Sequence, residues 1–264
     1  MDMMIHQVDA WMVALVFGGA MLTSWGIGRR SGRRFPPDAG HDPGMKFTEA
    51  SMAILGLLLA FTFAMALGRH DDRRLRVVAE SNAIGDFYTC ASLLKEPHRT
   101  ALQSVIRDYA QNELGVLSQL LPAAEQQKAI LRSQEMHGRM TDIVEQAIAE
   151  GTPIAMNLTD TLNGVTSANA SRLAAYEEIL PWSVQLLLLL AAIVPSFLIG
   201  KQQGASQKAR LSGTLSFVVL VALVIFVILD LNQPRRGLVR VRYECFERLI
   251  HSMADTGVRP VGPR

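Results

Sequence analysis

Residues 53–76 read AILGLLLAFTFAMALGRHDDRRLR. The uncharged apolar run ends at Gly68, and arginines and aspartates follow at once with no proline to stop a helix. This pattern is typical of a helix that leaves the hydrocarbon core of a membrane and continues into water. The stretch therefore predicts a membrane-spanning helix and marks the point where that helix reaches the aqueous phase.

Four segments of the chain are long and apolar enough to cross a bilayer, at a helical rise of about 1.5 Å per residue. They are residues 8–27, 47–68, 181–200 and 211–231. Their charged residues lie only at the ends, where headgroups and water can solvate them. The first segment lacks the basic leading region of a signal peptide, so we expect it to remain as a helix. We predict an all-α integral membrane protein with four transmembrane helices.

The first segment also carries Gly18, Gly19 and Gly26, which would allow another helix to approach closely. A basic block follows it, and its glycine- and proline-rich surroundings indicate a loop near lipid headgroups. The block consists of Arg29, Arg30, Arg33 and Arg34.

Residues 69–180 are polar enough for water and strongly helix-forming. Breaks are expected at Pro97, at Pro122 and at residues 151–153, which gives helices over 69–94, 98–121, 123–150 and 153–180. The first and last of these are expected to continue spans two and three. The last is polar on nearly all sides, which favours either a solvated outer helix or one that lines an aqueous vestibule.

The chain is thus expected to comprise four parts: spans one and two (8–68), an inserted helical region (69–180), spans three and four (181–231) and a basic tail (232–264). Arg240, Arg242 and Arg248 of the tail are expected to contact anionic lipids. The helical region has 11 Lys and Arg against 15 Asp and Glu, so nucleic acid is not an expected partner. Basic residues are shared almost equally between the two sides of the membrane, which leaves the orientation open.

No motif of covalent catalysis or nucleotide binding is present. The two cysteines lie far apart and the six histidines are scattered, so no metal or cofactor is expected. No span carries a charge at mid-depth, and a proton-coupled or ion-coupled carrier therefore lacks its usual marker. We expect a protein that is not an enzyme.

Three stretches carry a resemblance to a known family. The first is LGLLLAFTFAMA at 55–66 with the charged residues after it, the second is NAIG at 82–85, and the third is DLNQPRRGLVRV at 230–241. Together with the order of the spans, they resemble the bestrophin-like membrane proteins of bacteria, a family grouped with the bestrophin channels. The points of the third stretch that carry the match are Asp230, Pro234, Arg236 and Gly237.

This resemblance implies a homo-oligomeric ring, pentameric in bestrophins, with the second span lining a pore for small ions and forming a hydrophobic neck. It also implies a bacterial inner membrane location, with the helical region and both termini in the cytosol. The chain departs from the bestrophin channels in two ways. It lacks their aromatic-rich stretch after the pore helix, and no acidic calcium clasp is recognisable in its tail.

The candidates for the neck are Leu59, Phe61, Phe63 and Leu67. Two residues turn a helix by about 200°, so Phe61 and Phe63 are predicted to point to nearly opposite sides. The candidates for charges at the pore mouth are Arg69, Arg73, Arg76 and Glu80, where the arginines would favour anions. The alternative function is a non-conducting, membrane-anchored scaffold whose helical region binds a cytosolic partner.

Overall fold

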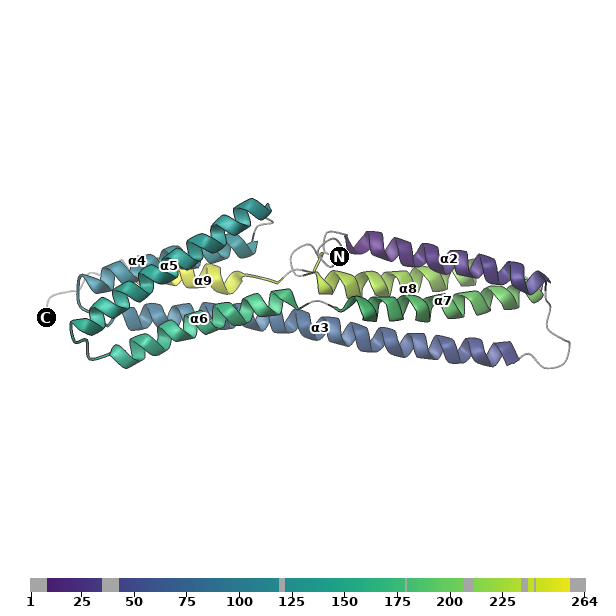
Figure 1. Cartoon of the computed structure of the whole chain (residues 1–264), viewed down its shortest axis with the longest axis horizontal. Coiled ribbons are helices and arrows are strands. Elements are labelled where there is room, and N and C mark those ends of the chain that lie inside the picture. The colour runs from purple at the N-terminus through teal and green to yellow at the C-terminus, as the bar shows by residue number, and fades with distance from the viewer. Residues whose placement is uncertain are drawn as a thin grey trace. The chain divides into compact units, whose positions relative to one another are not determined.

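The structure is a computed structural model of the 264-residue chain, and it describes residues 9–34, 43–118, 122–178, 180–206, 211–233, 237–239 and 241–256. Within these residues every regular element is a helix, as predicted (Figure 1). The helices are α2 (Ala10–Arg34), α3 (Pro43–Ala91), α4 (His98–Ser118), α5 (Ala123–Ala149), α6 (Ala155–Glu177), α7 (Trp182–Ala205), α8 (Leu211–Asn232) and α9 (Glu244–Thr256).

The chain divides into two compact units. The first unit comprises Met1–His70 and Ile179–Arg240, and the second comprises Asp71–Glu178 and Val241–Arg264. Helix α3 contributes to both units, because it stays helical through the change from apolar to charged sequence, as predicted for residues 53–76.

Four stretches contain helix that is long and apolar enough to cross a membrane: Ala10–Arg34, Lys46–Ala91, Ala155–Ala205, which takes in both α6 and α7, and Leu211–Asn232. These stretches include the predicted spans 47–68, 181–200 and 211–231 and residues 10–27 of the first predicted span. In α3 the apolar part ends at Gly68, so we take residues 47–68 as its membrane-spanning segment.

The expected continuity between the helical region and span three is wrong. Helix α6 ends at Glu177 and α7 begins at Trp182, with Pro181 as the residue before α7. Proline has no backbone N–H and disfavours a helical conformation in the residue before it, so it ends one helix and can open the next.

The basic block after the first span is also helical rather than a loop, since α2 continues to Arg34. Close packing against α7 accounts for this extension. A Cβ atom at Gly28 would lie 2.1 Å from the Phe197 carbonyl oxygen, and one at Gly200 would lie 2.1 Å from that of Trp25. Gly32 and Gly204 repeat the contact one turn further along.

Glycines four residues apart on both helices therefore bring the two backbones together, which is a favoured packing mode in membranes. Hydrogen bonds reinforce the contact. The Ser24 hydroxyl donates to the Ile193 carbonyl at 3.0 Å, and Trp25 Nε1 donates to Gln203 Oε1 at 3.1 Å.

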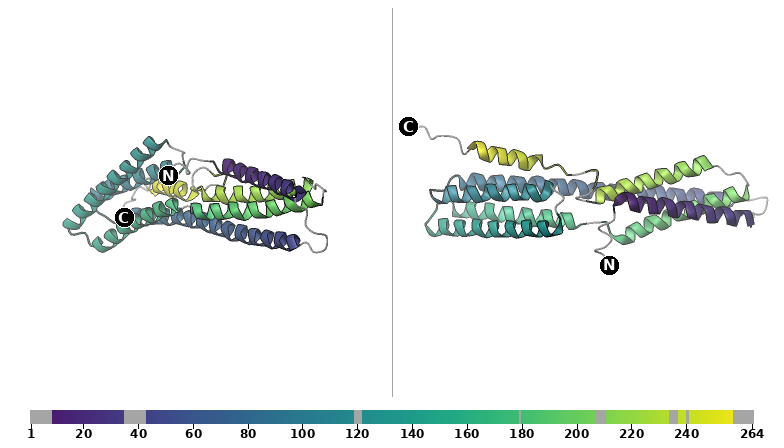
Figure 2. Two further views of the ribbon diagram at one scale, coloured as in Figure 1. Left: turned by 45° about the vertical axis from the view of Figure 1, so that its right-hand side comes forward. Right: turned by 90° about the horizontal axis from the view of Figure 1, so that it is seen from above.

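The second unit encloses its own apolar core, formed by the last part of α3 with α4, α5, α6 and α9 (Figures 1 and 2). Phe87, Ile106, Met140 and Phe246 are among its fully buried side chains. The predicted breaks near Pro97, Pro122 and residues 151–153 are confirmed, and Gly151 has the positive φ of 81° that such a turn favours.

Helix α6 buries an apolar face, although its sequence is polar on nearly all sides. Leu158, Leu162 and Val165 are buried on one face together with Arg172. The apolar residues at spacings of three and four give this helix an inner face, while its other side chains stay exposed or half-buried, as in a solvated outer helix packed on one side.

Candidate functional site

Helix α3 has one buried face and one open face within the first unit. Leu55, Leu59, Thr62 and Ala66 are buried at spacings of three and four residues, so they lie on one side of the helix. The opposite side carries mostly small and apolar residues that are exposed, namely Ala53, Leu57, Ala60, Ala64 and Gly68. No described atom lies within 4 Å of a Cβ placed at Gly56 or Gly68. This open face is the first part of the candidate site.

The four neck candidates differ in where the structure places them. Phe61 is 64% exposed, whereas Phe63 and Leu67 are about 40% exposed, at 38% and 41%. Leu59 is buried and belongs to the apolar core of its own unit. Leu59 therefore has its side chain engaged within the chain, and the other three keep theirs accessible.

The four charge candidates also separate. Arg76 is exposed and pairs with Asp72 one turn earlier at 3.3 Å, a surface contact of small energetic value. Arg69 is half-buried at the end of the apolar stretch. Arg73 and Glu80 are almost fully buried inside the second unit.

Arg73 serves as a cap for α6. Its Nε donates to the Ala175 carbonyl at 3.1 Å, and its Nη2 donates to the Glu178 carbonyl at 2.6 Å. The last carbonyls of a helix have no partners within the helix, and a cation is favoured there by the helix dipole. The positive charge of Arg73 is thus used to hold the end of α6 against α3.

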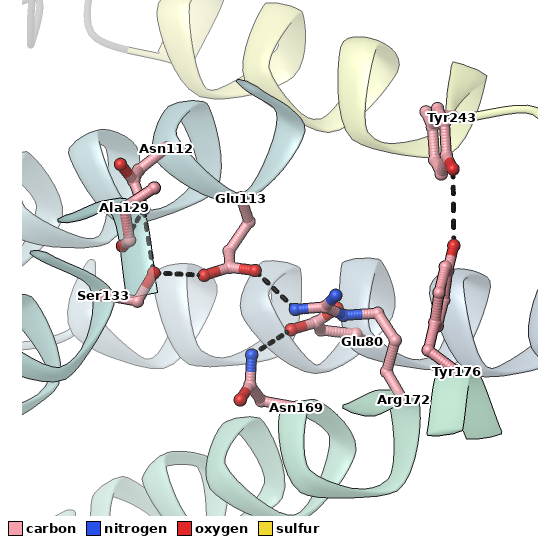
Figure 3. A network of polar contacts seen from close by, with 9 residues as sticks. All are labelled: Glu80, Asn112, Glu113, Ala129, Ser133, Asn169, Arg172, Tyr176 and Tyr243. Carbon is pink, nitrogen blue, oxygen red and sulfur yellow. Dashed lines mark hydrogen bonds and ion pairs between the residues drawn. The ribbon is translucent and has the colours of Figure 1, made fainter. Parts of the chain in front are cut away.

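Glu80 belongs to a buried ionic network that joins four helices (Figure 3). The Arg172 guanidinium of α6 donates to Glu80 of α3 through Nε and to Glu113 of α4 through Nη2. Asn169 adds a hydrogen bond to Glu80 at 2.8 Å, and the Ser133 hydroxyl of α5 donates to Glu113.

This network holds two carboxyl groups against one guanidinium in the interior of the second unit. Arg172, Glu80 and Glu113 have side chains that are 2%, 0% and 3% exposed. Burial raises the pKa of Glu80, and the nearby Arg172 opposes that rise. Burial likewise raises the pKa of the adjacent Tyr109 phenol, and the negative charges of Glu113 and Glu80 raise it further. The network therefore depends on Arg172 for its charge balance.

Residues 237–239 of the third stretch of the resemblance are bonded to the end of α8. The Asp230 carboxylate accepts hydrogen bonds from the backbone N–H groups of Leu238 at 2.8 Å and Val239 at 3.1 Å. A Cβ at Gly237 would lie 2.7 Å from the Asp230 carbonyl oxygen, so only glycine fits at that position. Pro234 and Arg236 lie outside the described residues. Asp230 and Gly237 thus have a structural role in holding residues 237–239 against the end of α8.

A metal site does not emerge from the part of the chain that the structure describes, where no three His, Cys, Asp or Glu side chains are grouped to hold an ion. The polar network is instead internally paired, and α3 offers an apolar face rather than a reactive one. The arrangement can pack, hold charge and line a surface.

These observations define an all-helical membrane protein with four apolar helices and a separately packed helical unit. A family model described as the Bestrophin-like domain matches residues 14–246. The chain therefore belongs to the bestrophin-like family, which confirms the resemblance seen in its sequence. Comparisons with curated proteins and with solved structures gave no match.

Sequence reasoning missed the partners of Glu80. Glu113 and Arg172 lie far from Glu80 in the chain, and nothing local links them. A signal was nevertheless present, because Glu113 follows the apolar positions Tyr109 and Ala110 at helical spacing on the buried side of α4. A charge on an otherwise apolar helix face calls for a buried counter-charge.

Proposed function

We propose that the protein is a homo-oligomeric ion channel of the cell membrane, with α3 lining the ion path. The observation that supports this most directly is the open face of α3. Within the most apolar 18-residue stretch of this helix, only 17% is buried within the chain, which is the lowest share among the four candidate spans. A ring of identical copies around an axis would place such a face at the centre or against a neighbouring copy.

The accessible apolar side chains of α3 would form the neck of this channel. Phe61, Phe63 and Leu67 are the candidates, since their side chains are exposed within a single chain. Because Phe61 and Phe63 point to nearly opposite sides, only one of the two would face the axis. A hydrophobic constriction controls conduction by expelling water from the narrowest part of the path. Leu59 would support the neck from behind by packing inside its own unit.

The charge at the mouth would come mainly from Arg69 and Arg76. Arg73 and Glu80 would act indirectly, because their buried contacts fix α3 against α6 and α4 rather than facing an ion path. The small ions conducted would then be anions by preference, as expected for a ring of arginines.

The location is a further part of the proposal. By analogy with the bestrophin channels, the protein would lie in a bacterial inner membrane, with the second unit and both termini in the cytosol. Arg242 and Arg248 are exposed and would lie near anionic headgroups on the cytosolic side, whereas Arg240 lies outside the described residues.

Single-channel recording tests the proposal. Purified protein in planar bilayers is expected to conduct, and Phe61→Ala or Phe63→Ala is expected to raise the current by widening or wetting the neck. Leu15→Ala is the matched control, since Leu15 is 66% exposed on α2 and should contact lipid only. Silence of the wild type and of both phenylalanine variants would contradict the proposal. A monomeric mass would favour the scaffold instead.

A further inference from the structure

The C-terminal end of α2 presents a basic hollow that the proposed channel function does not use. The hollow has a volume of about 540 Å³ and is lined by residues of three kinds: the arginines Arg29, Arg30 and Arg33, the apolar Trp25 and Ile27, and the small Thr23 and Gly26. It lies where the apolar sequence of the first span gives way to charge.

The side chains at this hollow are held in place by the packing of the first unit. The backbone of Arg29 lies against α7, because a Cβ at Gly204 would meet the Arg29 carbonyl oxygen at 2.3 Å. Trp25 donates to Gln203 at 3.1 Å, and Gln203 in turn donates to Thr214 of α8 at 3.0 Å. Three helices thus fix the tryptophan ring.

The guanidinium of Arg29 rests on this ring, with its central carbon 5.5 Å from the ring centroid. The Nε atom of Arg29 is buried and makes no hydrogen bond to any described residue. A guanidinium held in place by stacking is suited to a phosphate oxygen, which guanidinium groups bind through paired hydrogen bonds.

Among the residues that the structure describes, the helices at the hollow carry positive charge there. Neither α2 nor α7 contains an Asp or Glu, and α7 adds Lys201 near the same end. The described acid of α3 nearest the start of that helix, Glu49, is exposed. Ile27 is 59% exposed, and so an apolar wall that can meet an acyl chain adjoins the arginines.

We propose that this hollow binds the phosphate group of an anionic membrane lipid. The arginines would contact the headgroup, and Ile27 would contact the start of the acyl chain. A tryptophan at the hydrocarbon boundary and basic residues just beyond it are the elements that such a headgroup meets in a bilayer. A free phosphate ion shares the same headgroup chemistry, and the test below separates the two sources.

The test uses purified full-length protein in neutral detergent, with lipid binding followed by native mass spectrometry and by the shift in thermal midpoint. Phosphatidylglycerol is expected to bind at least tenfold more tightly than phosphatidylcholine and to raise the midpoint. Inorganic phosphate at millimolar concentration is expected to give no comparable shift. A shift of equal size from inorganic phosphate would overturn the lipid as the ligand.

Variants locate the site. Arg29→Gln with Arg33→Gln is expected to abolish the preference for phosphatidylglycerol, and Arg30→Gln alone, at an exposed position, is expected to weaken it severalfold. Arg34→Gln is the control of equal charge, because Arg34 is exposed on the same helix but does not line the hollow. An equal loss from Arg34→Gln and Arg30→Gln would show general attraction to the surface and overturn the proposal.

Discussion

Replacing Arg172 by methionine tests whether the ionic network holds the second unit together. Methionine keeps much of the length and apolar volume of the arginine stem but removes the charge. Glu80 and Glu113 would then lie in the interior without their shared guanidinium, with only Asn169 and Ser133 still donating to them. Removal of one partner from a buried ion pair is expected to destabilise by about 3–5 kcal/mol.

The magnitude can be bounded from the cost of neutralising a carboxylate. A glutamate with an ordinary pKa of about 4.3 requires about 3.7 kcal/mol to become protonated at pH 7. Glu80 requires less than this, because burial already raises its pKa in the native protein. The loss in the free energy of unfolding is therefore expected to stay below the cost of protonating both carboxyl groups.

The direction in which the stability of the variant changes with pH follows from its buried carboxyl groups. In the variant a buried carboxyl group has a raised pKa in the folded state, so stability falls as the pH rises through that pKa and recovers as the pH falls. The recovery should amount to about 1.4 kcal/mol per pH unit for each carboxyl group involved. Hydrogen exchange of backbone amides in α4 and α6, between pH 5 and pH 8, would measure it in the full-length protein.

A matched control is Arg139→Met on α5, where the arginine is exposed and the expected change is within about 0.5 kcal/mol. Adding Glu80→Gln to Arg172→Met should restore part of the lost stability, since one buried charge is removed. The reasoning would be refuted if Arg172→Met matched the wild type in amide protection over the whole pH range.

Three further perturbations follow from the packing. Glu80→Gln should reduce the gain in stability of the second unit as the pH falls from neutral, because the raised pKa of Glu80 makes its protonation favour the folded state; hydrogen exchange at several pH values checks this. Gly200→Ala should lower the thermal midpoint by several degrees, since its Cβ would lie 2.1 Å from a carbonyl oxygen of α2, whereas Gly19→Ala has nothing within 4 Å and should not. Asp230→Ala should cost about 1–3 kcal/mol by leaving two backbone N–H groups without their acceptor, measured as faster exchange of the amides of residues 238 and 239.

The membrane helices could be predicted from the sequence because their signal is local. A long uncharged run and an abrupt charged end are visible in any window of the chain, and so α3 was placed correctly across residues 53–76. The contact between α2 and α7 is not local. Gly28 and Gly200 are ordinary membrane glycines until the structure shows that each meets the other helix's backbone, whereas Gly19 and Gly26 meet nothing.

The charged residues after the span show the same limit. The residue type alone does not tell whether an arginine on a helix faces water or a partner helix, and Arg73 and Arg76 are only three residues apart. The distinction lies in the spacing to the apolar stripe. Arg73 follows Ala66 by seven residues and precedes Val77 by four, which places it on the buried side of α3, while Arg76 is turned towards solvent.

The open face of α3, opposite to that buried stripe, bears on the proposed assembly. The open face of α3 at Leu57 and Ala64 continues, at the same helical angle, to Leu75 and Val78. Lipid accounts for an exposed leucine at position 57, but position 75 follows the charged cluster and belongs to the second unit. Leu75 is nonetheless 65% exposed and Val78 is 37% exposed. In the ring of copies proposed above, a neighbouring copy would cover these apolar side chains of the second unit.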